Sequence, residues 1–184
     1  DNLDGGIVGV NYFAKKDLQN VVVVSPDAGG VYRCKQFRER FKEVSPTDEE
    51  PGLAMIIKQR SGANKIATMD LVGSVDGCDV IIVDDMIDTA GTLCKAAAEL
   101  KRRGAKRVYA LASHGLFSGN ASANIEKSCL EEVVVLNTVP ANAKIAGNPK
   151  VVHISVAQLL ADAMECVHDN KSISALFKLR DEER

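Results

Sequence analysis

The chain has 184 residues, a formal net charge of −2, a hydrophobic share of 46% and a charged share of 26%, which suit one domain with a sizeable core. The nearly balanced charge and the lack of a basic stripe argue against binding to nucleic acid. No apolar run approaches membrane-spanning length and no signal-peptide pattern opens the chain, so we expect no membrane partner.

The amino-terminal third contains a first strand–loop–helix unit. The chain opens with Asp1-Asn2-Leu3 rather than with a methionine, and a helix is expected over residues 4 to 19. The four valines from Val21 to Val24 then predict a strand that is buried on both faces. A second helix is expected from Val31 to Phe41, so that a short loop joins a buried strand to a helix.

The loop of this unit reads Ser25-Pro26-Asp27-Ala28-Gly29-Gly30. Gly29 and Gly30 let the backbone approach a ligand closely, and the loop leads into a helix N-terminus, which favours an anion. The carboxylate of Asp27 can hold a metal ion that a diphosphate also coordinates, because Mg²⁺ prefers carboxylate, phosphate and water oxygens. Taken alone, the loop could equally be a Pro-Asp-Gly turn that needs no ligand.

A polar segment and a basic segment flank the next strand, which is expected from Ala54 to Ile57. Residues 45–52 contain two prolines and three carboxylates and are predicted to form a surface insertion without chemistry. Residues 58–67 include Lys58 and Arg60 and lack apolar periodicity, which indicates a flexible basic loop. Such cations could close over a polyphosphate and neutralise charge on transferring phosphoryl oxygens, or the loop could simply be a solvated edge.

Two strands are expected next, from Met69 to Gly73 and from Cys78 to Val83, and the Asp76-Gly77 pair between them is typical of a hairpin turn. The second strand contains four consecutive β-branched residues, from Val80 to Val83, and is therefore predicted to be buried on both faces. It leads directly into the segment on which the functional prediction depends.

That segment runs from Asp84 to Thr92 and ends at a helix for which Thr89 or Thr92 is the expected cap. A turn of small residues at a helix N-terminus presents backbone N–H groups to an anion. The expected phosphate-binding residues are Asp88, Thr89, Ala90, Gly91 and Thr92. Asp84 and Asp85 can accept hydrogen bonds from sugar hydroxyls, so the pattern predicts a sugar phosphate. The alternative is an acidic strand-to-helix turn with an ordinary cap.

The remaining elements continue the alternation of helices and buried strands. Helices are expected over 92–103, 124–129 and 155–168, the last capped by Ser155, and strands over 108–112, 133–136 and 151–154. The glycine-containing loop 113–119 carries His114, which could transfer a proton, bind a ligand or only fix the loop.

This alternation predicts an α/β domain with a doubly wound, mostly parallel sheet flanked by helices. Ligands of such sheets gather at the carboxyl ends of the strands, where we expect 27–30, 58–60 and 84–92 to meet. The five scattered cysteines lack the spacing of metal ligands and indicate reduced thiols in a cytoplasmic protein.

The segment from Val83 to Thr92 resembles the phosphoribosyl-binding motif of type I phosphoribosyltransferases and, within that group, of the ribose-phosphate diphosphokinases. The loop 25–30 and the Lys58-x-Arg60 pattern are similar to the diphosphate-binding loop and the catalytic loop of the diphosphokinases. The resemblance covers nearly the whole chain and implies a type I phosphoribosyltransferase-like domain. Because Asp1-Asn2-Leu3 is similar to the family's domain junction, it also implies the second of two domains.

The resemblance implies transfer of the diphosphoryl group of ATP to ribose 5-phosphate, with Mg²⁺ as cofactor and with 5-phosphoribosyl 1-diphosphate and AMP as products. Asp84 and Asp85 would orient the ribose hydroxyls, and Asp88 to Thr92 would hold the 5-phosphate. Lys58 and Arg60 would stabilise the transition state. The residues implied for the diphosphate are Asp27, Ala28, Gly29 and Gly30, with Asp27 also at the metal.

The family's ATP-binding strings belong to an amino-terminal domain and do not occur in this sequence, so we expect the chain to bind ribose 5-phosphate without completing catalysis alone. The resemblance further implies a homo-oligomer of dimers assembled into a hexamer. It implies a regulatory phosphate or nucleotide site that includes Asp1, Asn2, Ser172, Ser174 and Phe177. From its chemistry alone, the tail could instead be only a packed cap.

Two other functions stay open at this stage. The first is a phosphoribosyltransferase that acts on a nucleobase, which would need a base-binding hood that the sequence does not reveal. The second is a non-catalytic regulatory subunit associated with a diphosphokinase. Such subunits typically have a disrupted sugar-phosphate loop or basic loop, whereas both are intact in this sequence.

Overall fold

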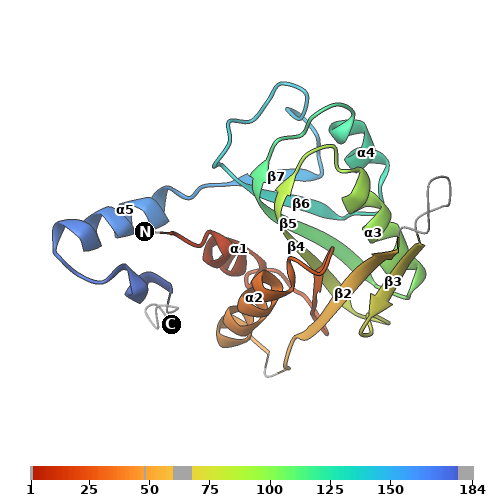
Figure 1. The fold of residues 1–184 in the computed structure, drawn as a ribbon, viewed down its shortest axis with the longest axis horizontal. Coiled ribbons are helices and arrows are strands. Elements are labelled where there is room, and N and C mark those ends of the chain that lie inside the picture. The colour runs from red at the N-terminus through yellow and green to blue at the C-terminus, as the bar shows by residue number, and fades with distance from the viewer. Residues whose placement is uncertain (1, 48, 60–67, 178–184) are drawn as a thin grey trace.

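A single sheet of seven strands organises the computed structural model, which describes residues 2–47, 49–59 and 68–177 (Figure 1). The strand order is β3-β2-β1-β4-β5-β6-β7. Neighbouring strands are parallel except for the antiparallel pair of β2 and β3. The strands are β1 (Val22–Ser25), β2 (Gly52–Gln59), β3 (Thr68–Val72), β4 (Asp79–Ile87), β5 (Arg107–Gly115), β6 (Glu132–Leu136) and β7 (Val151–Ile154).

Helices cover both faces of this sheet, which confirms the predicted doubly wound α/β fold. The helices are α1 (Gly6–Phe13), α2 (Val31–Val44), α3 (Gly91–Arg102), α4 (Ala121–Lys127), α5 (Ala157–His168) and the 3₁₀ helix η1 (Ile173–Phe177). Phe13 of α1 and Phe37 of α2 belong to one buried cluster, and Leu100 of α3 and Ile125 of α4 belong to the other. The sheet therefore separates two apolar cores.

Strand β4 lies at the centre because its side chains serve both cores. Val80 and Ile82 pack with α3, whereas Ile81 and Val83 pack with α1 and α2. Val80, Ile81 and Ile82 are fully buried, and burying such a side chain contributes about 1.5–3 kcal/mol relative to exposure. The apolar run that predicted a strand buried on both faces thus occupies the middle of the sheet.

The predicted hairpin between β3 and β4 is wrong. A turn forms at Asp76 and Gly77, but β3 pairs with β2 at the edge of the sheet, and β4 pairs with β1 and β5. The Gly77 N–H group donates to the carbonyl oxygen of Gly104, so the turn packs against the segment after α3. A strand that is apolar on both faces is stabilised in the middle of the sheet, and there its partners come from distant parts of the sequence.

Several predicted boundaries also shift. Helix α1 ends at Phe13 rather than near residue 19. Leu18 is also buried, but it lies five residues after Phe13, and this spacing does not match the helical repeat. Strands β4 and β5 extend together to Ile87 and Gly115, because each supplies the backbone partners of the other. The predicted acidic turn therefore begins inside a strand.

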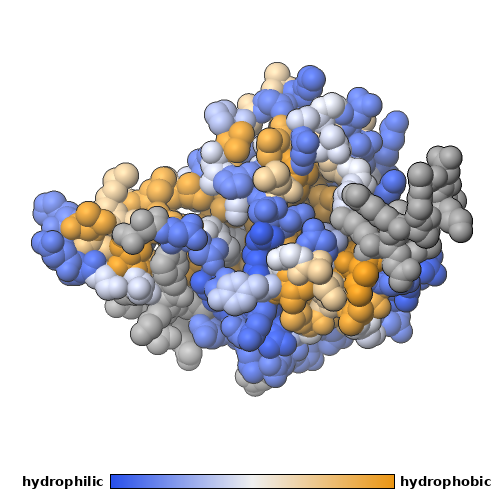
Figure 2. All heavy atoms as spheres, viewed as in Figure 1, coloured by the Kyte–Doolittle hydropathy of each residue, from blue (hydrophilic) through white to orange (hydrophobic). Residues whose placement is uncertain are grey.

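Helix α5 and the tail after it stand apart from the sheet and its covering helices (Figure 1). Leu160, Met164 and Val167 on α5 are 43%, 68% and 62% exposed. Figure 2 shows hydrophobic surface over α5 and over the β2–β3 region, separated by a hydrophilic band. Within the described residues, no helix is long and apolar enough to cross a membrane.

Candidate functional site

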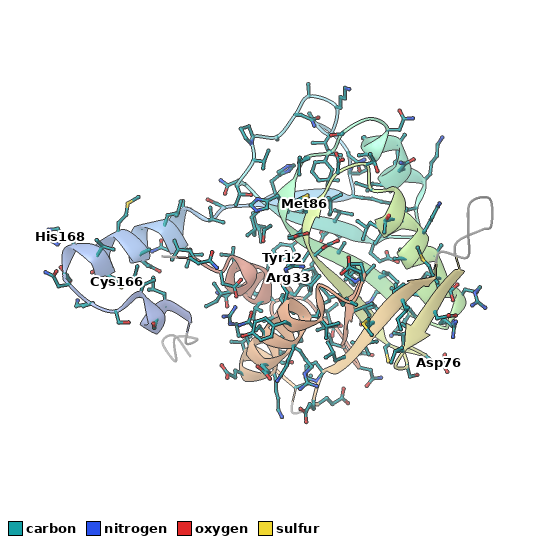
Figure 3. All side chains as sticks on the ribbon, in the orientation of Figure 1. Tyr12, Arg33, Asp76, Met86, Cys166 and His168 are labelled. Atoms are coloured by element: carbon teal, nitrogen blue, oxygen red, sulfur yellow. The ribbon has the colours of Figure 1, made fainter. Side chains whose placement is uncertain are left out.

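A cavity of about 1010 Å³ opens where the carboxyl ends of β4, β5 and β6 meet α1, α2 and α5. Figure 3 shows Arg33, from α2, and Met86, from β4, toward this edge of the sheet. The polar groups at the cavity include those of Gly29, Arg33, Asp84, Asp85, His114 and Thr138. Ligands of doubly wound folds collect at this edge, so the cavity is the candidate site.

The loop between β1 and α2 is held by its own side chains. The buried Ser25 hydroxyl donates to the carbonyl oxygen of Asp27 at 2.6 Å. The Gly30 N–H group donates to Oδ1 of Asp27 at 3.0 Å, and α2 begins at the next residue. Asp27 thus forms a turn that its own hydrogen bonds stabilise without a ligand, and Asp27 is exposed to solvent.

The acid pair at the end of β4 faces a cation from α2. The Nη1 atom of Arg33 lies 3.6 Å from Oδ1 of Asp84, and its Nη2 atom lies 3.4 Å from Oδ2 of Asp85. Oδ1 of Asp84 also accepts the Asp85 N–H group at 2.9 Å, and Oδ1 of Asp85 accepts the Met86 N–H group at 2.8 Å. One guanidinium therefore spans both carboxylates.

The two carboxyl groups have different proton affinities. Burial raises the pKa of Asp84 to about 6, and the neighbouring charge of Asp85 also contributes. For Asp85, burial disfavours ionisation, but the hydrogen bond with Asp84 and the charge of Arg33 outweigh it and lower the pKa. Near neutral pH the pair is ionised, and below about pH 6 it retains its charge mainly on Asp85.

The segment after β4 forms a left-handed entry into α3. Ala90 is the N-cap with φ of 58°, and no side chain caps the helix, so the predicted caps at Thr89 and Thr92 are wrong. Ala90 is only 5% exposed and packs in the core beside Ile87 and Leu93. That packing holds an alanine in a left-handed conformation, which residues other than glycine seldom adopt.

The carbonyl groups of this segment are engaged by the β5–α4 segment. The carbonyl oxygen of Ile87 accepts the N–H groups of Leu116 and Phe117 at 2.9 and 3.2 Å. The carbonyl oxygen of Thr89 accepts the side-chain amide of Asn124 at 3.0 Å.

The amides of the same segment are left available. In the part of the chain that the structure describes, none of the N–H groups from Asp88 to Thr92 donates to a protein acceptor. Free amides at the N-terminus of a helix of 12 residues constitute an anion-binding arrangement.

The structure brings together only part of the predicted site. Gly29, Asp84 and Asp85 line the cavity, as do Asn2 and Ser174, which were expected at a regulatory site. Ser172 instead accepts a hydrogen bond from the Ser174 N–H group within the tail. The predicted residues that lie outside the described structure are Asp1, Arg60 and the side chains of Lys58 and Phe177.

Sequence reasoning missed Arg33 and Asn124, which contact predicted site residues. Arg33 is one of several cations on α2, and nothing in the local pattern separates it from them. Asn124 lies 35 residues from the residue whose carbonyl oxygen it binds. Only their arrangement in space reveals them.

The carboxylates near the cavity are the candidate ligands of a metal ion. Among the described residues, no three His, Cys, Asp or Glu side chains gather in a metal-binding cluster. Asp27 is an exposed carboxylate, which suits a Mg²⁺ ion that takes most of its ligands from phosphate and water.

Several known proteins are similar to this chain. Residues 45–178 match the family model described as the phosphoribosyl synthetase-associated domain. The ribose-phosphate pyrophosphokinase of Vibrio parahaemolyticus is 43% identical over 177 residues, which cover 96% of this chain and 54% of that protein. The enzyme of the same name from Pasteurella multocida is 46% identical over 178 residues, with coverage of 96% and 54%.

A solved structure is similar as well. The phosphoribosylpyrophosphate synthetase of Mycobacterium smegmatis superposes with a TM-score of 0.74 at 32% identity, covering 90% of this chain and 51% of that chain. The chain therefore spans about half the length of the curated relatives and of the solved protein that it matches.

Proposed function

Because this chain belongs to the phosphoribosyl synthetase-associated domain family, we propose that it supplies the ribose 5-phosphate site of a ribose-phosphate diphosphokinase. The complete enzyme would transfer the diphosphoryl group of ATP to ribose 5-phosphate and release 5-phosphoribosyl 1-diphosphate and AMP. Relatives named ribose-phosphate pyrophosphokinase, at 43% and 46% identity, support this proposal.

The observation that carries the proposal is the free amide edge from Asp88 to Thr92, directly after an acid pair. The amides would donate to the oxygens of the 5-phosphate, and the partial positive charge of the α3 N-terminus would favour that dianion. Asp84 and Asp85 would accept hydrogen bonds from the ribose hydroxyls. Phosphate and hydroxyls of one molecule would thus be read by consecutive parts of one strand–loop–helix unit.

The loop 27–30 would take the diphosphate end of the ligand. Gly29 lines the same cavity as the acid pair, and α2 offers a second helix N-terminus at Val31. Mg²⁺, when bound, would neutralise phosphate charge, and Asp27 would hold it together with phosphate and water oxygens. Lys58 and Arg60 remain proposed as the cations that stabilise the transferring group.

We propose that a second domain completes the enzyme. The relatives are nearly twice as long as the matched region, and the chain carries none of the family's ATP-binding strings. The proposed arrangement is a homo-oligomer of dimers assembled into a hexamer. The exposed apolar side chains of α5 support an interface there. The five unpaired cysteines favour the cytoplasm as its location.

Calorimetric titration of this chain with ribose 5-phosphate, inorganic phosphate and ribose tests the proposal. We expect ribose 5-phosphate to bind more tightly than either component, because it engages the amides and the acids together. The double variant Asp84→Asn plus Asp85→Asn should weaken the binding of ribose 5-phosphate at least about tenfold, since two hydrogen-bond acceptors for the sugar are altered. It should not weaken the binding of inorganic phosphate, since it removes negative charge near that anion.

The matched control removes two acidic charges from residues that do not line the cavity. Glu126→Gln plus Glu131→Gln alters two exposed acids, one on α4 and one just before β6. It should leave the affinities for ribose 5-phosphate and for inorganic phosphate as they are in the unaltered chain. Equal binding of ribose 5-phosphate by the unaltered chain and by the Asp84/Asp85 variant would contradict the proposed site.

A further inference from the structure

His114 is fixed at the end of β5 by the segment that follows β6. Its Nδ1 atom lies 2.8 Å from Oγ1 of Thr138. The same hydroxyl donates to the carbonyl oxygen of Ser113 at 2.5 Å. An isolated backbone bridge joins His114 to Asn137 at the same point. The imidazole is therefore held by two adjacent strand ends.

These two contacts determine which ring nitrogen carries the proton. The carbonyl oxygen of Ser113 can only accept, so Thr138 must give it the single proton of its hydroxyl. The Thr138 oxygen then has only lone pairs to offer, and Nδ1 of His114 must be the donor of the second bond. In the neutral ring only one nitrogen carries a proton, so Nε2 is an acceptor.

The residue that carries this free acceptor lies at the candidate site. In the parallel pair of β4 and β5, Asp84 pairs with Ala112 and Met86 pairs with His114. His114 therefore lies two residues beyond the partner of Asp84, about 7 Å along the strands. Both line the cavity. Among the residues that the structure describes, no protein group bonds to Nε2.

We propose that Nε2 of His114 accepts a hydrogen bond from a hydroxyl group of the bound sugar phosphate, a role that rests on the proposed function. A neutral acceptor suits this position, because Asp84 and Asp85 already bring negative charge toward a ligand that carries a phosphate. A third carboxylate would add repulsion toward the phosphate group of the ligand. Arg33 has only hydrogen-bond donors and therefore cannot accept a bond from a hydroxyl group. The ligand class that His114 selects is a hydroxylated phosphate ester rather than phosphate itself.

The first test measures the tautomer in the ligand-free chain. Long-range ¹H–¹⁵N correlation of the neutral imidazole should report a protonated Nδ1 and an unprotonated Nε2. Thr138→Ser keeps the hydroxyl and should keep this pattern. Thr138→Val removes it and should give a mixture of tautomers. A proton on Nε2 in the unaltered chain would overturn the proposal.

The second test separates a ligand-binding role from a purely structural one. His114→Asn keeps a donor near the Nδ1 position, so that the contact with Thr138 can persist, but it has no atom at the Nε2 position. We expect it to lower the affinity for ribose 5-phosphate about tenfold and to leave the affinity for inorganic phosphate unchanged. His114→Gln places an amide near the Nε2 position and should recover part of the affinity.

The outcomes distinguish this role from the function on which it rests. If the unaltered chain fails to bind ribose 5-phosphate, the proposed function fails and the role of His114 fails with it. If ribose 5-phosphate binds and His114→Asn binds it equally well, only the role of His114 is overturned, and His114 is then a residue that merely fixes the loop. An equal loss for ribose 5-phosphate and inorganic phosphate would also overturn it.

Discussion

The loops after β1 and β4 share a pattern but are held in place differently. Both follow buried parallel strands that pair with each other, and both lead into a helix. The loop after β1 fixes itself through Ser25, Asp27 and Gly30. The loop after β4 is fixed by the β5–α4 segment, which binds the carbonyl oxygens of Ile87 and Thr89.

This difference separates local from tertiary control of an anion site. A self-contained turn can form before the fold is complete, but its own side chain occupies the Gly30 amide. In the second loop, distant residues engage the carbonyl groups, so the amides face outward together. Preorganised donors of this kind require no rearrangement when the anion arrives.

The largest expected effect is on the free energy of unfolding, when the glycine of one loop or of the other is replaced by alanine. A Cβ atom at Gly30 would lie 2.7 Å from Oγ of the buried Ser25, which could move only by giving up its bond to Asp27. Gly30→Ala should therefore lower the free energy of unfolding by about 1–3 kcal/mol. Chemical denaturation measures this change.

Gly91→Ala is the matched substitution in the second loop. The nearest atom to its added Cβ would be Oγ1 of Thr89 at 3.8 Å, an ordinary contact. We expect unchanged or slightly higher stability, because alanine is the better helix former by about 1 kcal/mol. Similar losses for both variants would mean that the loops do not differ in the way described.

A smaller effect concerns the tertiary tether of the second loop. Asn124→Leu removes the donor to the Thr89 carbonyl oxygen, so one hydrogen bond no longer holds the loop. The affinities for inorganic phosphate and for ribose 5-phosphate should both fall, by about five- to tenfold. Calorimetric titration of both ligands measures it.

Asn148→Leu is the control for that tether. Asn148 also donates to a backbone carbonyl oxygen at 3.0 Å, but to that of Ser122, at the other side of α4. Its loss should lower stability without altering either affinity. Equal loss of affinity in the two variants would place the effect in α4 as a whole rather than in the bond to Thr89.

The smallest effect is the pH dependence of the acid pair, which only the second unit carries. Asp84 has a pKa raised to about 6, so the folded state holds its proton more tightly than the unfolded state does. Its favourable contribution is complete below the ordinary pKa near 4 and is lost as the pH rises through about 6.

Asp84→Asn should consequently stabilise the chain above about pH 6 and give no gain below about pH 4. The gain should be modest because the side chain is 31% exposed. Thermal unfolding of both chains across this range measures it. A gain that does not change with pH would contradict the raised pKa.

The sequence pattern predicted the fold where burial alone decides the structure. Val80 to Val83 had to lie at the centre of a sheet, because their side chains are apolar on both faces. The hairpin at Asp76 and Gly77 was predicted wrongly, because a local turn signal does not determine which strands pair. Strand order follows from contacts between distant residues, which a single sequence does not contain.

The residues of the candidate site also differ in whether the sequence alone could predict them. Asp84 and Asp85 could be predicted, because two acids after a buried strand form a local pattern. Ala90 could not be predicted as the helix cap, because its left-handed backbone depends on its packing in the core. Arg33 reaches the acids from another helix, and nothing in its neighbourhood in sequence distinguishes it.

The most direct test of this account is residue-resolved hydrogen exchange at the Thr89–Thr92 amides with and without ribose 5-phosphate. In the ligand-free chain these amides have no acceptor among the described residues, so they should exchange rapidly. Ribose 5-phosphate should slow them, and ribose without phosphate should not. Exchange that stays equally fast with saturating ribose 5-phosphate would contradict the claim that this loop binds the phosphate.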